Sequence, residues 1–258
     1  MGEAKDIVLR PIPAKDANEL VKRVHYSGKV VQNSQLHIGV FYRGELEGAM
    51  QFGPSLDKRK IQGLVSGTQW HEFIELNRMA FSDTLPRNSE SRALSIAMKL
   101  LRKFAPQIKW VITFADGTQC GDGTIYRAAG FMLTGIKVNK SILEMPDGTI
   151  KADKTLNNPN YKIKGESAGY WKRKGAEPLS GFQLRYIYFI DPTYREKLTV
   201  PELPYSEIQR RGAGMYKGKP RGRGETDNAP QSNEETGGAS PTRPLLDSLT
   251  GGMPELIN

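Results

Sequence analysis

The chain has 258 residues and a hydrophobic fraction of 38%, enough to bury a sizeable core. It has no apolar run of the roughly 18–20 residues that a membrane helix needs. No signal peptide is recognisable at its start, and its one cysteine excludes an internal disulfide, so we expect a cytoplasmic protein. From Glu207 onward seven basic residues balance seven acidic ones, so the net charge of +9 belongs to residues 1–206. This excess favours a polyanionic partner such as a nucleic acid.

Strand and helix patterns alternate along residues 1–206. Period-two and period-3.6 patterns predict strands over 7–12, 36–42, 46–52, 73–81, 109–115, 131–138 and 184–190, and helices over 14–25, 90–104 and 122–129. Arg43-Gly44 is expected to turn a hairpin, and Asn88 or Ser89 to cap the second helix. An inserted hairpin over 142–154 is expected to turn at 146–148.

This order predicts one α/β domain, residues 1–206, around a central mixed β-sheet flanked by helices. The strand over 109–115 is apolar almost throughout, which suits a buried position in the sheet. Residues 207–258 are rich in Gly, Ser, Arg and acidic residues, so we expect a low-complexity, disordered tail.

Two basic segments are candidates for contact with DNA. Within residues 157–174, cations that suit phosphates alternate with aromatic rings that suit an unstacked base. They are Tyr161, Lys162, Lys164, Tyr170, Trp171, Lys172 and Arg173. The second segment is Lys58-Arg59-Lys60, which follows a Gly-Pro turn. The alternative for both is a solvated charged surface.

Five short motifs occur together in one order along residues 20–190. They are His25-Tyr26-Ser27-Gly28, residues 75–79 (ELNRM), residues 88–92 (NSESR), residues 114–117 (FADG) and residues 124–131 (TIYRAAGF). In this order the chain resembles the phage Mom family of adenine-modifying proteins, within the GNAT acyltransferase-like superfamily. The resemblance implies a GNAT-like domain that converts adenine to N6-carbamoylmethyladenine in double-stranded DNA. It also implies an adenine flipped out of the duplex, action in the host bacterial cytoplasm and protection of phage DNA from restriction.

The resemblance assigns candidate catalytic roles to Asp116 and Tyr126. Asp116 ends the most buried-looking strand, where α/β sheets often place ligand-binding groups, and could act as a general base or a metal ligand. The alternative is a turn-former, because Asp-Gly is a common turn pair that Asp122-Gly123 repeats. Tyr126 corresponds to the GNAT tyrosine that protonates the leaving group. Its alternative is a core tyrosine with a capped hydroxyl.

His25 and Tyr26 close the first predicted helix, and both are candidate catalytic residues. An ordinary histidine pKa suits proton transfer, and the ring is a natural ligand for a transition metal. The family's suspected iron dependence suggests Fe(II) held by His25 and Asp116, although no metal-binding spacing supports it. The alternative for His25 is a cap on the helix end. Tyr26 could stack on or hydrogen-bond the base.

The donor group is expected at Arg78, Ser89, Ser91 and Arg92. Strand alternation places Arg78 on the same face as Leu76, and a charge there needs a partner such as a donor amide or phosphate. The alternative partner is Glu75 or Asp83. Residues 86–92 lack the glycine-rich turn with which GNAT enzymes cradle a pyrophosphate, so acetyl-CoA as donor is in doubt. Cys120, with no adjacent histidine, is expected to be an incidental thiol.

Two rival functions stay open. An ordinary GNAT N-acyltransferase would use acetyl-CoA on a protein or a small amine and would ignore DNA. A non-catalytic DNA-binding protein would bind DNA in a salt-dependent way without modifying it. Direct acyl transfer from a thioester would give an amide at N6, whereas a carbamoylmethyl group is attached through an sp³ carbon.

Overall fold

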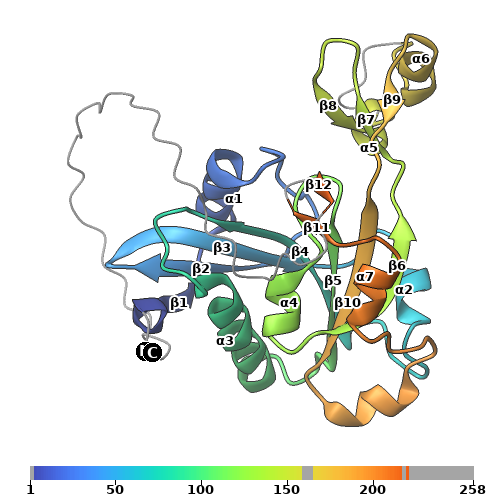
Figure 1. Cartoon of the computed structure of the whole chain (residues 1–258). Helices are drawn as coiled ribbons and strands as arrows, with labels where there is room; N and C mark the ends of the chain where they lie inside the picture. The colour runs from blue at the N-terminus through green and yellow to red at the C-terminus, as the bar shows by residue number, and fades with distance from the viewer. Residues whose placement is uncertain (1–2, 159–164, 217–218, 221–258) are drawn as a thin grey trace, which may run out of the picture.

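The computed structural model describes residues 3–158, 165–216 and 219–220. A seven-stranded sheet forms the centre in the order β1-β2-β3-β4-β5-β10-β6 (Figure 1). Its strands are β1 (Val8–Pro11), β2 (Leu36–Tyr42), β3 (Glu45–Gly53), β4 (Phe73–Phe81), β5 (Trp110–Asp116), β10 (Phe182–Phe189) and β6 (Met132–Val138). Neighbouring strands are antiparallel except β4 and β5, which are parallel. The predicted α/β domain with a mixed central sheet is confirmed.

Both faces of the sheet are covered. The larger core lies under α3 (Ser89–Phe104), whose apolar positions recur at helical spacing, and α4 (Thr124–Ala128) lies beside α3 over the same face (Figure 1). On the other face, α1 (Ala14–Val24) packs against β2, β3 and β4. A second cluster on β4, β5 and β10 is covered by the segment after α2 (Lys58–Gln62) and by the 3-10 helix η2 (Pro192–Lys197).

The buried position predicted for the apolar strand is confirmed. Trp110, Val111 and Ile112 of β5 are fully buried between β4 and β10. Side chains alternate between the faces, so Val111 joins the core under α3 and Ile112 the cluster on the opposite face. The β2–β3 hairpin turns at Arg43-Gly44 as predicted, with positive φ at both residues.

The capping prediction for α3 is confirmed for the position of Asn88 but not for a bond from its side chain. Asn88 occupies the N-cap in the left-handed region (φ 70°), and its side chain makes no capping hydrogen bond. Ser89 is the first helical residue and is fully buried, so it faces the core. The side chain of Ser91 instead donates to the Asn88 carbonyl at 3.2 Å.

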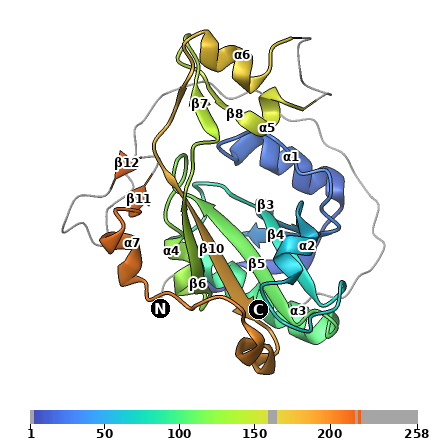
Figure 2. The same cartoon turned by 90° about the vertical axis from the view of Figure 1, so that its right-hand side faces the viewer.

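The insertion between β6 and β10 forms an arm that projects beyond the end of the sheet (Figures 1 and 2). It contains β7 (Ile142–Glu144), β8 (Ile150–Ala152), α5 (Asp153–Leu156), α6 (Ala168–Arg173) and β9 (Glu177–Pro178). The strands pair in the order β8-β7-β9, and the predicted hairpin lies between β7 and β8. The arm has its own core, Leu143, Met145, Leu156, Ala168 and Ala176, separate from those of the main sheet.

The chain continues to pack past residue 206, where the sequence placed the start of the tail. Ile208 of α7 (Ser206–Arg210) and Ala213 are buried in the core under α3. Met215 starts the short hairpin of β11 (Met215–Tyr216) and β12 (Lys219–Pro220), and its carbonyl accepts from the Asp122 amide at 3.2 Å. Residues 207–216 therefore belong to the domain, while most of the expected tail lies outside the described residues. In the described part of the chain, no helix is long and apolar enough to cross a membrane.

Candidate active site

The five predicted catalytic residues come from four elements and meet where β4 and β5 separate. The two strands pair only over Phe73–Glu75 and Trp110–Ile112, so β4 beyond Glu75 has no partner on that side. Arg78 projects from this part of β4 toward the end of α1, where His25 and Tyr26 lie. Asp116 at the end of β5 and Tyr126 on α4 both couple electrostatically to Tyr26. We refer to His25, Tyr26, Arg78, Asp116 and Tyr126 as the catalytic cluster.

A β-bulge sets the direction of Arg78. Gln51 of β3 pairs with Arg78 while the next residue, Phe52, pairs with Leu76, so Asn77 is an extra residue in β4. Leu76 and Met79 both pack into the core under α3, whereas Arg78 points to the α1 side. The prediction that Leu76 and Arg78 share a face is therefore wrong, because the inserted residue shifts the alternation.

Arg78 holds His25 as a neutral ring. The His25 Nε2 atom lies 3.2 Å from a terminal nitrogen of Arg78, and since a guanidinium can only donate, Nε2 accepts. The ring proton is then on Nδ1, which donates to the Ser27 hydroxyl at 2.9 Å. The Ser27 amide, 3.1 Å from Nδ1, would favour the opposite tautomer, but the charged guanidinium makes the stronger hydrogen bond. Burial, and next the charge of Arg78, lower the pKa of His25 to about 3.

Proton transfer was expected at His25 because an ordinary histidine has a pKa near 6.5. With a pKa of about 3, the His25 ring is instead neutral throughout the physiological pH range. A neutral His25 is a hydrogen-bond acceptor that fixes Arg78 rather than an efficient base. No ion pair joins Arg78 to a carboxylate among the described residues, so the alternative partners Glu75 and Asp83 are not used.

Asp116 stabilises a turn, as its alternative predicted, while its catalytic role stays a prediction. One carboxylate oxygen accepts from the Thr118 amide at 3.1 Å and from the Asn139 side chain at 3.2 Å, which is how an aspartate stabilises a turn. The charge of Asp116 also contributes to raising the pKa of Tyr26. Asp122, by contrast, is buried and pairs with Arg127 at 3.3 Å, which is a structural role.

Tyr126 is packed on one side and polar on the other. Its ring lies 5.4 Å from that of Tyr186 and 5.8 Å from that of Phe131, as the core alternative predicted. Burial raises the pKa of its hydroxyl to about 12. The hydroxyl therefore keeps its proton at neutral pH and can serve as a donor. Tyr26, whose ring is 51% exposed, also has a raised pKa, first through desolvation and then through Asp116.

Glu75 and Cys120 also border the cluster. Burial raises the pKa of Glu75, and its charge acts on Tyr126. Cys120 couples to Tyr26, Asp116 and Tyr126, and desolvation raises the pKa of its thiol. Cys120 lies four residues after Asp116, whereas Glu75 becomes a neighbour of Tyr126 only when β4, β5 and α4 assemble.

Behind Arg78 lies a row of polar side chains that sequence reasoning missed. His37, Gln51 and Arg78 are direct cross-strand partners on β2, β3 and β4, so their side chains share the α1 face. From α1, Asn18 accepts from the amide nitrogen of Gln51 at 2.8 Å, two turns before His25 meets Arg78. Gln51 is fully buried, and its Oε1 atom and Arg78 Nε are both buried without a hydrogen-bond partner. The row is joined to α1 through Gln51 and Asn18 and lies next to Arg78 on the same face of the sheet.

The residues do not fit the Fe(II) expectation. Among the described residues, no three His, Cys, Asp or Glu side chains come together as a metal site. Both ring nitrogens of His25 are engaged, and the one nearer the cluster faces a guanidinium, whose charge would repel a metal ion. We therefore derive no step through iron.

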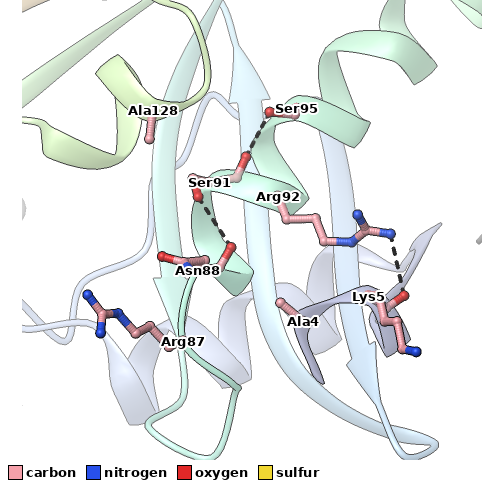
Figure 3. A pocket seen from close by; sticks show the side chains of 8 residues that line it. All are labelled: Ala4, Lys5, Arg87, Asn88, Ser91, Arg92, Ser95 and Ala128. Atoms are coloured by element: carbon pink, nitrogen blue, oxygen red, sulfur yellow. Dashed lines mark hydrogen bonds between the residues drawn. The ribbon is translucent and has the colours of Figure 1, made fainter. Parts of the chain in front are cut away.

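A cationic depression lies at the start of α3, where the donor was expected. It has a volume of about 440 Å³ and is lined by Lys5, Arg87, Asn88, Ser91, Arg92 and Ser95, together with two alanines (Figure 3). Ser91 and Arg92 line it as predicted, but Ser89 does not, because its side chain is buried. Three cations and a helix N-terminus favour an anionic ligand such as a phosphate. The three cations can attract a phosphate at a place where other GNAT enzymes use a glycine-rich turn.

The predicted DNA-binding residues fall into separate regions. Tyr161, Lys162 and Lys164 lie outside the described residues. Tyr170, Trp171, Lys172 and Arg173 lie on α6 of the arm. Trp171 packs against the core of the arm, and Lys172 pairs with Asp153 at 3.4 Å, so both help to hold the arm together.

The second predicted segment, Lys58-Arg59-Lys60, lies at the start of α2. Lys58 and Arg59 line an open pocket beside this helix. The Lys60 amide donates to Asp57, which caps the helix. The side chains of Lys58 and Arg59 are thus at the surface, where a phosphate could reach them.

Comparison with solved structures finds chains of similar fold at low sequence identity. Solved structures similar to this chain include the ribosomal-protein-S18-alanine N-acetyltransferase of Escherichia coli, with 10% identity and a TM-score of 0.40 over 71% of this chain and 94% of that one. Another is the spermidine/spermine N-acetyltransferase SpeG of Vibrio cholerae, with 8% identity and a TM-score of 0.42 over 75% of this chain and 98% of that one.

Sequence relatives confirm the family resemblance that the ordered motifs indicated. The chain is 35% identical over 199 residues to the methylcarbamoylase Mom of Escherichia phage Mu, which covers 76% of this chain and 80% of that protein. Residues 6–207, which include the catalytic cluster, the arm and most of the lining of the depression, match the model of one family. The chain belongs to the Mom protein family.

Proposed function

We propose that this protein transfers a carbamoylmethyl group to the exocyclic N6 amine of adenine in double-stranded DNA. The observation that supports this best is a half-buried Arg78 that has no carboxylate partner and lies among Asp116, Tyr26 and Tyr126. Such an arginine is available to a group that gains negative charge during the reaction. Family membership and the positive charge of residues 1–206 supply DNA as the substrate.

The chemistry needs a base, an acid and a positioned electrophile. The N6 lone pair is delocalised into the ring, so a proton must leave as the new bond forms. Asp116 accepts this proton from N6. The N6–carbon bond forms as the bond from the sp³ carbon to its leaving group breaks, and Tyr126 gives its proton to the departing group. His25 acts by holding Arg78, and Tyr26, half exposed at the cluster, is available to contact the base.

The adenine must leave the base stack to reach this cluster, as enzymes that act on a base atom generally require. Lys58 and Arg59 on one side and α6 of the arm on the other provide cations for the flanking phosphates. In the biological setting this activity would act in the host cytoplasm and mark phage DNA against restriction.

Expression in bacteria followed by mass spectrometry of digested DNA nucleosides tests this function. The wild-type chain should produce N6-carbamoylmethyladenine, and the Asp116→Ala, Tyr126→Phe double variant should produce none. Tyr194→Phe is the control, because its hydroxyl bonds Glu72 away from the cluster and should not affect the product. Absence of the product with the wild type, or its persistence in the double variant, would contradict the proposal.

The cationic depression favours a second candidate, an N-acyltransferase that uses acetyl-CoA, because a pyrophosphate suits three cations at a helix start. Acyl transfer to adenine would give an amide rather than a carbamoylmethyl group, so the two functions predict different products. Tight binding of acetyl-CoA, acetylation of an amine and no change in DNA nucleosides would support this candidate instead.

A further inference from the structure

A second pocket adjoins the catalytic cluster, and the chemistry described so far makes no use of its aromatic wall. It has a volume of about 600 Å³, and its lining includes Gln35, Leu56, Lys58, Arg59 and Trp70. Leu56 is 79% exposed and Trp70 is 49% exposed, so two large apolar side chains face solvent at one place. Two cations lie beside them, while the lining contributes a single carboxylate, Asp57.

The pocket is tied to the cluster through a short segment. The Asn33 side chain donates to the Pro54 carbonyl at 2.5 Å, and the Ser34 hydroxyl donates to Asn77 at 3.2 Å. Asn77 is the bulge residue that directly precedes Arg78. Gln35, the next residue after Ser34, lines the pocket. One short chain segment therefore joins the pocket to the strand residue that precedes Arg78.

We propose that this pocket binds an unstacked nucleobase of the DNA strand next to the target adenine. The inference rests on the proposed function. Trp70 offers a ring for stacking, Leu56 an apolar edge and Gln35 an amide that can pair with a base edge. Lys58 lies 4.4 Å from the centre of the Trp70 ring, and with Arg59 it places positive charge where the phosphate beside that base would lie. An apolar protein partner would not call for two cations at this position, so a nucleic acid is favoured.

The function of such a pocket would be to hold open the duplex on one side of the flipped adenine. Stacking on an aromatic ring compensates for the stacking that the neighbouring base loses. Every base has a face that can stack, so selectivity among bases would come from Gln35 and the pocket wall. The residue at position 35 should thus affect which DNA sequences around the target adenine are modified.

Binding of a short fluorescent single strand containing adenine to the full-length protein tests the pocket. Trp70→Ala should weaken binding about tenfold, whereas Trp70→Phe should stay within about twofold of the wild type because it keeps a stacking face. Phe104→Ala is the matched control: Phe104 is also exposed and has Lys103 over its ring, but it lies at the end of α3. It should bind like the wild type.

Two further measurements distinguish loss of base stacking on Trp70 from a general loss of binding surface. Trp110 is fully buried and Trp171 packs on the arm, so Trp70 should account for most of the quenching of tryptophan emission by the strand, and Trp70→Phe should remove it. Lys58→Ala should lower the slope of log affinity against log salt by about one, whereas Lys103→Ala should not.

The outcomes distinguish this pocket from the proposed function. Wild-type affinity and quenching in the Trp70 variants would overturn the pocket, even if modified adenine is found. Self-association that Trp70→Ala abolishes, without any effect on the strand, would assign the patch to a second copy of the chain and also overturn it. Weaker binding by Trp70→Ala, together with no modified adenine from the wild type, would support the pocket and reject the proposed chemistry.

Discussion

The catalytic cluster and the cationic depression both contain arginine, but the arginines lie in different surroundings. Arg78 is half buried, bonded to His25 and supported by the buried row that contains Gln51. Lys5, Arg87 and Arg92 line an open surface at the start of α3. A charge in a partly desolvated site acts strongly and is little screened, whereas surface charges are weakened by water and salt. Loss of the one arginine in the cluster should therefore reduce the rate of modification more than loss of several cations in the depression.

The largest effect should follow loss of Arg78. Arg78→Ala should reduce the rate of adenine modification about 100- to 1000-fold, because a fixed donor aimed at developing charge is removed. Arg78→Lys should recover little, since an ammonium cannot reproduce the fork that bonds His25 and the reacting group together. The rate is measured by mass spectrometry of nucleosides over a time course at saturating DNA.

Arg185→Ala is the matched control for Arg78. Arg185 is also a half-buried arginine, but its guanidinium is bonded to Thr134 at 3.0 Å and 2.6 Å, outside the cluster. Its loss should lower the melting temperature without changing the rate per folded molecule. Equal losses of rate in the two variants would mean that Arg78 acts only through stability.

The buried row predicts a smaller effect. Gln51→Met keeps the volume but removes the hydrogen bonds that join Gln51 to Asn18 and His37 in the row next to Arg78, so the guanidinium should be held less firmly. We expect kcat to fall about tenfold while the affinity for DNA stays unchanged.

Gln62→Met is the control for this variant, since the Gln62 side chain bonds the Thr68 carbonyl at 2.6 Å away from the cluster. It should affect stability alone. An unchanged kcat in Gln51→Met would show that the row is only a packed polar part of the core.

At the depression the comparison predicts a weaker, salt-dependent effect. The Arg87→Ala, Arg92→Ala double variant should raise the KM for the donor several-fold and leave kcat nearly unchanged, because these cations bind rather than react. The effect should shrink as salt is raised, in contrast to the effect of Arg78→Ala. A salt-independent fall in kcat would mean that the depression contributes to the chemical step.

The two regions also differ in how far the sequence could predict them. Residues of the cluster sit in short motifs at strand and helix ends, so their convergence follows from the order of elements. The bulge at Asn77 is one extra residue that the hydrophobic pattern does not reveal. The side of the sheet on which Arg78 lies was therefore predicted wrongly. The pKa of His25 depends on a contact across 53 positions, which spacing cannot reveal.

The depression and the arm show the same limit for different reasons. Ser89 and Ser91 differ by two positions, and only the helical turn decides that the first is buried and the second lines the depression. Trp171 looked like a stacking residue because it lies among cations, yet the arm is too small to form a core without it. Ile208 was placed in a tail because Gly, Arg and Lys dominate the residues after it.

The smallest predicted effect concerns pH and would show whether the cluster is as desolvated as the comparison requires. His25 has a folded-state pKa of about 3 against an ordinary value of 6.5. As the pH falls below about 6.5, the unfolded chain binds a proton at His25 that the folded chain does not, so the free energy of unfolding decreases. His25→Gln removes this linkage while keeping an acceptor for Arg78, and its melting temperature should fall less than that of the wild type between pH 7 and about pH 5. His71→Gln, at an exposed histidine, should follow the wild type. If His25→Gln and the wild type show the same pH dependence, His25 is solvated, and the contrast between a buried cluster and an open depression no longer holds.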